Sequence, residues 1–349
     1  METIRGIVPP YLLRQVASLE DDRFATAAMA AQAALNERPL RPDVPRPRSR
    51  PSASVGEQPL RRRVHDAENG TDLPGRLVRD EGDPATDDVG ADEAYDGFGS
   101  TDALFRSVYE RSSMDDAGMP LLGTVHYGRA YDNAFWDGSQ MVFGDGDGEI
   151  FGRFTASLSV IGHELTHGLI EFTAGLVYRG QSGALNESVA DVFGALVEQH
   201  AAGQGADQAS WLIGEGLFTD QVQGRALRSM SAPGTAYDDD VLGKDPQPGH
   251  MDDFVETTQD NGGVHLNSGI PNKAFHLVAT ALGGNAWDVA GRIWLDTLVG
   301  ELSPRATFEQ FAVATFTAAR AHDAADVVRE AWQAVGVWTS STNPSSSFR

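Results

Sequence analysis

The sequence predicts an α+β protein whose first half is rich in strands and whose second half is mainly helical. Two patterns predict this order. Short segments punctuated by Gly and Asp, such as GTVHYGRAYDNAFWDGSQMVFGDGDGEIF, are typical of strands joined by tight turns. After Arg153, apolar residues recur at helical spacing instead. Because 41% of the 349 residues are hydrophobic, the chain can bury a sizeable core.

The first 55 residues are predicted to form a separate leader. A helical pattern rich in Ala and Leu covers about residues 11–37, and RPLRPDVPRPRSRPSASVGEQ follows, with five prolines between Pro39 and Pro51. Such a segment cannot build a core and is typical of an exposed linker that proteases cut. Through Arg63 the chain holds eleven arginines against seven acidic residues, whereas the whole chain has a net charge of −23. Opposite charge therefore favours docking of the leader on the body.

Three further units are expected after the leader. Residues 56–175 are predicted to be β-rich and to end in a helix, residues 176–338 to be helical, and residues 339–349 to form a flexible tail. Helices are expected over residues 154–173, 185–202, 273–282, 286–298 and 308–321. The first of them is predicted to end at Gly175 in the manner of a glycine C-cap.

The DGDG string invites comparison with a calcium-binding EF-hand loop, but its frame does not fit. Ile150 and Ala156 occupy the positions where the loop needs Gly and Glu. We therefore interpret this string as a hairpin turn.

Composition excludes several classes of function. The negative net charge argues against nucleic acid or an anionic membrane as a partner. The absence of cysteine excludes disulfides and thiolate metal sites, so that a metal needs His, Asp or Glu ligands. No apolar run is long enough for a membrane span, and METIRGIVPPYLLRQVASLEDD lacks the apolar core of a secretory signal. We expect a monomer that is either cytoplasmic or secreted by a non-classical route.

The strongest functional signal is the segment SLSVIGHELTHGLIEF. His163 and His167 are four residues apart, so they project from the same face of a helix, which is a usual arrangement for zinc. Glu164 lies beside them, suited to touch a metal-bound water as a base. In ALNESVADVF, Glu187 offers a third ligand, and Asp191 is spaced to accept the spare N–H of a ligating histidine. The alternative, a buried helix with chance histidines, leaves this spacing unexplained.

With these residues the chain resembles the thermolysin-like zinc metallopeptidases, or neutral proteases. The resemblance runs from about Val64 to Trp338 and is carried by NAFWDGSQMVFGDGDG, HELTHGLIEFTAGLVYRGQSGALNESVADVFG, ALRSMS and QDNGGVHLNSGIPNKAF. The leader, with IVPPYLL, is similar to the short propeptide of the protealysin-like branch. The resemblance implies a two-domain fold with the zinc site in the cleft between the domains.

The resemblance also implies roles for individual residues. It assigns zinc to His163, His167 and Glu187, with Glu164 as general base. The remaining assignments are Tyr178 and His265 as donors to the developing oxyanion, Asp260 as the carboxylate that orients His265, Asn186 and Asp191 as partners of the zinc histidines, and Asn133, Ala134 and Arg228 as contacts to the substrate backbone.

The resemblance further implies a preference for a bulky hydrophobic residue just after the cut. The pocket for that residue is matched by five apolar side chains, Phe151, Phe154, Val160, Ile213 and Leu227. It also implies a calcium site, of which Glu198 and Glu215 remain. Because Ser159, Ser210 and Leu212 stand where the family has acids, we expect weak or absent calcium binding.

The predicted function is a zinc-dependent endopeptidase made as a zymogen, with its own leader as an intramolecular inhibitor and peptides or proteins as substrates. Two alternatives remain open. An aminopeptidase with the same zinc motif would need extra acidic residues for a free amino terminus. A catalytically silent binding protein would not be expected to retain the complete set of catalytic residues.

Overall fold

The computed structural model describes residues 6–36 and 58–339. The predicted Pro-rich linker and residues 340–349 of the predicted tail lie outside the described residues. The α+β prediction is confirmed, with a mixed sheet in the first half of the body and helices in the second. No helix within the described ranges is long and apolar enough to cross a membrane.

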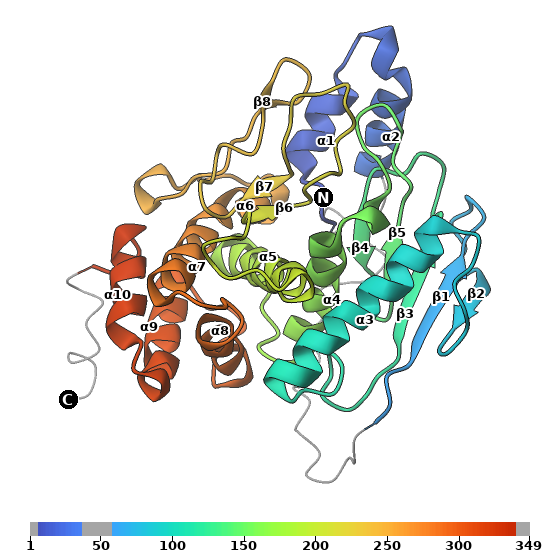
Figure 1. Ribbon diagram of the computed structural model, residues 1–349. Helices are drawn as coiled ribbons and strands as arrows, with labels where there is room; N and C mark the ends of the chain where they lie inside the picture. The colour runs from blue at the N-terminus through green and yellow to red at the C-terminus, as the bar shows by residue number, and fades with distance from the viewer. Residues whose placement is uncertain (1–5, 37–57, 340–349) are drawn as a thin grey trace.

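The leader contains two helices where one pattern was predicted. Helix α1 (Pro10–Ala17) is followed by a short 3₁₀ turn and then by α2 (Ala25–Asn36). Proline is well suited to the first turn of α1, because its fixed φ matches the helix and its missing N–H needs no partner there. The two helices pack on each other, and the chain before them runs toward the middle of the molecule (Figure 1).

The first half of the body is built on a five-stranded sheet with the order β2-β1-β3-β5-β4. The β1–β3 and β3–β5 pairs are parallel, and the two edge strands pair antiparallel with their neighbours. The strands are β1 (Arg62–Asp66), β2 (Arg76–Asp80), β3 (Leu121–Val125), β4 (Ala134–Trp136) and β5 (Met141–Phe143).

The DGDG string does not form the predicted hairpin turn. The antiparallel hairpin lies just before it, between β4 and β5. The string itself is a loop after β5 in which the N–H groups of Gly146 and Gly148 donate to the carbonyls of Tyr131 and Phe151. Both glycines have positive φ, which explains why the segment has the composition of a turn.

Helix α3 (Val89–Tyr109) packs against β1 and β3 on one side and α4 on the other, and the sequence interpretation did not include it. Its three glycines weaken the helical pattern. One of them has a packing reason, because a Cβ at Gly97 would lie 2.4 Å from Ile161 Cδ1. The glycine therefore allows α3 to approach α4 closely.

The second half consists of helices and a few short strands; four of the five predicted helices begin three to five residues from the predicted start, whereas all five end within two residues of the predicted end. The 154–173 prediction divides into a 3₁₀ turn over residues 154–156 and α4. The helices are α4 (Leu158–Phe172), α5 (Gly180–Ala202), α6 (Asp260–Asn267), α7 (Gly269–Leu282), α8 (Val289–Val299), α9 (Phe308–Ala319) and α10 (Ala325–Ala334). The short pairs are β6 (Leu212–Ile213) with β7 (Arg228–Ser229), and β8 (Asp238–Asp239) with β9 (Gly243–Lys244).

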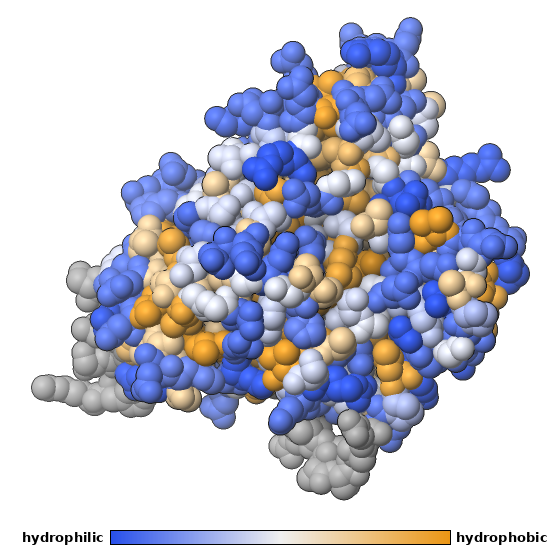
Figure 2. Space-filling model, in the orientation of Figure 1, coloured by the Kyte–Doolittle hydropathy of each residue, from blue (hydrophilic) through white to orange (hydrophobic). Residues whose placement is uncertain are grey.

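Helices α4 and α5 form the centre of the molecule and pack unusually closely (Figure 1). A Cβ at Gly194 of α5 would lie 2.4 Å from the carbonyl oxygen of Ser159, and a Cβ at Gly162 of α4 would lie 3.0 Å from Gly194 Cα. Two glycines thus bring the backbones together, which allows side chains of both helices to meet at one point. On the face shown in Figure 2, hydrophilic residues dominate and apolar residues form only scattered groups, as expected for a chain with a net charge of −23.

Candidate metal centre

Three predicted metal ligands converge between α4 and α5. His163 and His167 project from α4 with their Nε2 atoms 3.2 Å apart. Each Nε2 atom lies 3.6 Å from a carboxylate oxygen of Glu187 on α5. One ligand atom from each residue falls within 4.8 Å of the others, and all three side chains are buried.

The chemistry of these donors fits a cation. Asp191 Oδ1 accepts from His163 Nδ1 at 2.8 Å, and Asn186 Oδ1 accepts from His167 Nδ1 at 2.8 Å. Both protons therefore lie on Nδ1, and two Nε2 lone pairs face each other beside a carboxylate. Such lone pairs repel one another unless a positive ion lies between them, and this donor set is typical of zinc.

Asp191 connects His163 to Arg228, the arginine that was predicted to contact the substrate backbone. Arg228, which is fully buried, donates from Nε and Nη2 to the two oxygens of Asp191, both at 2.8 Å. Asn272 Nδ2 also donates to Asp191 at 2.8 Å. Although burial opposes it, the Arg228 charge lowers the pKa of Asp191, so this carboxylate stays ionised and holds both the imidazole of His163 and the guanidinium.

Glu164 presents one free oxygen to the site. Its Oε2 atom accepts from the backbone N–H of Trp136 on β4 at 3.0 Å, whereas Oε1 is buried without a hydrogen-bond partner. Burial and the nearby Glu187 charge raise the pKa of Glu164 well above its ordinary value. This side chain is therefore held on one side and available for proton transfer on the other.

Tyr178 and His265 also contact Glu187. The Tyr178 hydroxyl donates to Glu187 Oε1 and lies 3.2 Å from His265 Nε2. Asp260 orients the imidazole, because Oδ1 lies 2.6 Å from His265 Nδ1 and Oδ2 accepts from the His265 backbone N–H at 2.9 Å. Burial lowers the pKa of His265, but the charges of Glu187 and Asp260 outweigh it and raise the value to about 9. Residues 260–263 all have positive φ, which explains the two glycines in this turn.

The leader passes over these residues just before α1 begins. The N–H of Ile7 donates to the Ala134 carbonyl at 3.0 Å, and the N–H of Val8 donates to Asn133 Oδ1 at 3.0 Å. Arg228 Nη1 donates to the Ile7 carbonyl at 2.9 Å. All three residues that were predicted to contact the substrate backbone thus contact the leader.

The five predicted pocket residues are fully buried in the main apolar core, to which Ile7 also belongs. They come from separate elements. Val160 is on α4, Ile213 on β6 pairs with Arg228 of β7, and the rings of Phe151 and Phe154 lie 5.8 Å apart. Of these five residues, Ile213 is the one that pairs with the arginine that holds the leader.

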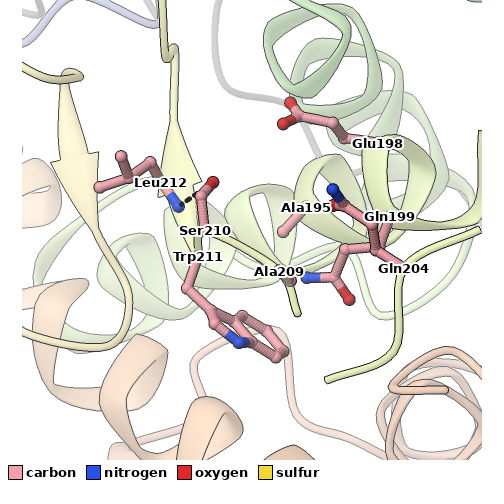
Figure 3. A pocket seen from close by; sticks show the side chains of 8 residues that line it. All are labelled: Ala195, Glu198, Gln199, Gln204, Ala209, Ser210, Trp211 and Leu212. Carbon is pink, nitrogen blue, oxygen red and sulfur yellow. Dashed lines mark hydrogen bonds between the residues drawn. The ribbon is translucent and has the colours of Figure 1, made fainter. Parts of the chain in front are cut away.

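The predicted calcium residues do not form a matching acidic cluster. Glu198 lies near the end of α5 at the edge of a small pocket that also contains Ser210 and Leu212 (Figure 3). Burial and the Glu215 charge raise the pKa of Glu198, while Glu215 itself is exposed. Ser159 is buried and accepts the N–H of Gly214 at 3.1 Å, so it serves a backbone group.

Comparison with known proteins agrees with this geometry. The model of the thermolysin metallopeptidase catalytic domain matches residues 55–171, and the model of the alpha-helical domain matches residues 174–337. The chain is 51% identical over 338 residues to an extracellular metalloprotease of Pectobacterium carotovorum subsp. carotovorum, with 96% of each chain covered. The chain belongs to the thermolysin family of metallopeptidases. It is therefore a metalloendopeptidase, and its buried His-His-Glu site fits the zinc dependence of that family.

Two further relatives of this thermolysin-family chain also match nearly its whole length. Protease PrtS of Photorhabdus sp. (strain Az29) is 48% identical over 343 residues, which cover 95% of this chain and 92% of the relative. The structure of the precursor of protealysin, a metalloproteinase from Serratia proteamaculans, matches with a TM-score of 0.88 and 50% identity. That match covers 96% of this chain and all of the precursor.

Sequence reasoning missed two partners of the site in this family member. Trp136 positions Glu164 through its backbone N–H, a group with no signature in the side-chain sequence. Asn272 holds Asp191 from a position 81 residues away, and only its place in the string QDNGGVHLNSGIPNKAF could have drawn attention to it.

Proposed function

We propose that this chain is the zymogen of a zinc-dependent neutral endopeptidase that cuts on the N-terminal side of bulky hydrophobic residues. The observation that carries the proposal is the convergence of three lone-pair donors from α4 and α5 beside a carboxylate with one unpartnered buried oxygen. A buried catalytic base next to a divalent-metal site is the arrangement that hydrolysis needs.

Each side chain has a distinct part in the proposed reaction. Zinc, when bound by His163, His167 and Glu187, supplies a Lewis acid that activates water and polarises a carbonyl. Glu164 accepts a proton from the attacking water and delivers it to the leaving nitrogen. Tyr178 and His265 donate hydrogen bonds to the oxygen that becomes negative.

Backbone recognition orients the substrate. Asn133 accepts a peptide N–H, the Ala134 carbonyl accepts another, and Arg228 donates to a carbonyl, as they do with the leader. The pocket of Phe151, Phe154, Val160, Ile213 and Leu227 then selects an apolar residue after the cut. A digest of a peptide library tests this preference, and charged residues at that position would contradict it.

The leader is proposed as an intramolecular inhibitor. Its residues Gly6–Val8 occupy the partners that a substrate backbone needs, and α1 and α2 anchor it to the body. We also propose domain divisions at residues 55 and 175, with processing in the linker outside the described residues. The similarity to a precursor structure supports the zymogen assignment.

The experiment that tests the function is metal exchange on the processed protein. Casein hydrolysis should be abolished by o-phenanthroline and restored by zinc. Activity that survives complete metal removal would contradict the proposal.

The Pectobacterium relative is named an extracellular metalloprotease, which supports secretion of this chain. We propose a non-classical route of secretion, and we expect a monomer. Fractionation of culture medium and cells, followed by size-exclusion chromatography, tests both expectations.

A further inference from the structure

The leader passes through the site with the polarity of a substrate. Ile7 contributes an N–H to Ala134 and a carbonyl to Arg228, and the next N–H along the chain, that of Val8, goes to Asn133. These three residues are the ones proposed to hold the substrate backbone. The backbone groups of Ile7 and Val8 therefore mark the part of the leader that follows a cut.

The carbonyl of Gly6 lies among the groups proposed for the chemical step. His265 Nε2 is 3.1 Å from the Gly6 oxygen. The same Nε2 atom is 3.2 Å from the Tyr178 hydroxyl and 3.5 Å from Glu187 Oε2. The Gly6 oxygen thus lies beside an oxyanion donor, next to a metal ligand, and the peptide bond after this carbonyl joins Gly6 to Ile7.

From this register we infer that the Gly6–Ile7 peptide bond occupies the cleavage position and is hydrolysed by the chain's own active site. The inference rests on the proposed endopeptidase function and adds an internal substrate to it. The side chains on either side of the bond agree with it. Ile7 is a bulky apolar residue, fully buried, directly after the bond. Gly6 fits because a Cβ there would lie 2.6 Å from Asn133 Oδ1.

The reaction needs water as its only co-reactant. The water oxygen bonds to the Gly6 carbonyl carbon while Glu164 takes a proton. The bond between this carbon and the Ile7 nitrogen breaks, and Glu164 passes the proton to that nitrogen. Gly6 ends as a carboxylate and Ile7 as an amino terminus, so that Met1–Gly6 leaves as a hexapeptide.

The remaining leader stays bound after this cut. Helix α1 begins at Pro10, directly after the bound segment, and Leu12 and Val16 of α1 are buried. Gln15 Nε2 donates to the Val241 carbonyl at 3.1 Å, and the Ala27 N–H of α2 donates to Glu149 at 2.9 Å. Cleavage at Gly6–Ile7 therefore converts a substrate-like inhibitor into a product-like one without activating the enzyme.

The first test follows the amino terminus of the zinc-loaded full chain by intact mass and Edman sequencing. The wild type should lose Met1–Gly6 and begin at Ile7, at a first-order rate independent of protein concentration, while Glu164→Gln keeps all six residues. If the wild type keeps the Gly6–Ile7 bond but cleaves casein after processing, the inference fails and the proposed function stands. If neither cleavage occurs, the proposed function fails with it.

The second test measures, without catalysis, whether Ile7 and Val8 are bound in the site. In the Glu164→Gln full chain, the amide hydrogens of Ile7 and Val8 should exchange slowly with solvent. Adding Ile7→Asp should increase their exchange at least tenfold, because a buried apolar anchor is replaced by a charge, while the amides of α5 remain protected and report that the body is folded. Met29→Asp, at a leader position that is 68% exposed, is the matched control and should change nothing. Equal protection in the Ile7→Asp and Met29→Asp chains would overturn the inference.

Discussion

Helix α5 carries two glutamates, Glu187 in its first half and Glu198 in its second, and the two differ in what surrounds them. Glu187 meets two imidazole lone pairs, and although burial opposes it, the nearby positive charge of His265 lowers the pKa of Glu187 to about 2. Glu198 meets Ser159, and burial raises its pKa. A carboxylate on a buried helix thus becomes a metal ligand only where neighbouring elements supply further donors to the same point.

The largest effect is expected from Glu187→Gln, which removes the only charged ligand of the site. Zinc should be lost and casein hydrolysis with it, because two neutral imidazoles leave the metal underligated. Metal analysis by mass spectrometry, with hydrolysis by the processed protein, provides the measurement. The matched control is Glu198→Gln on the same helix, which should keep both zinc and activity. Equal zinc loss in both variants would remove the distinction between the two carboxylates.

Glu164→Gln should separate metal binding from chemistry. The amide can still accept the N–H of Trp136 but cannot take a proton, so zinc remains while kcat falls by ~10²–10⁴-fold. Steady-state kinetics of the processed protein and its zinc content are measured together. Near-normal turnover with full zinc content would show that another group is the base.

Tyr178→Phe tests the tyrosine whose hydroxyl donates to Glu187. Removing one oxyanion donor typically lowers kcat by ~10²–10³-fold, and we expect the low end because His265 remains. KM should change little, since the lost bond strengthens mainly as the oxygen becomes negative. A rise in KM with kcat unchanged would place Tyr178 in ground-state binding instead.

The metal site was predictable from sequence because helical spacing places His163 and His167 together, and the fold class followed from the order of patterns and from the family strings. Helix α3 was not predictable, because its three glycines weaken the apolar pattern and the packing of Gly97 against Ile161 cannot be seen in the sequence. The position at which the leader binds in the site was also not predictable. It depends on backbone groups of Gly6, Ile7 and Val8, which any residues possess, and on partners that are more than one hundred positions away.

Asn186→Ala should have a smaller effect on the metal. Asn186 accepts from His167 Nδ1 and donates to the Leu176 carbonyl at 2.9 Å, so its loss frees one ligand ring. Loss of such a partner typically weakens metal affinity by ~10–100-fold. Competition with a zinc-chelating dye measures the dissociation constant. An unchanged constant would show that α4 alone fixes the ring.

The smallest effect is expected from adding calcium. This prediction concerns Glu198. Calcium needs 6–8 oxygen ligands, several of them charged, whereas Glu198 has Ser159 and Ser210 nearby and an exposed Glu215. Ligand binding raises the melting temperature only when its concentration exceeds the dissociation constant. Millimolar calcium should therefore leave the melting temperature of zinc-loaded protein within about 1 °C, since a stabilisation of 1 kcal/mol would move it by ~2–4 °C in a 150–250-residue domain. A larger rise that Glu198→Gln abolishes would show that this half of α5 also binds a metal.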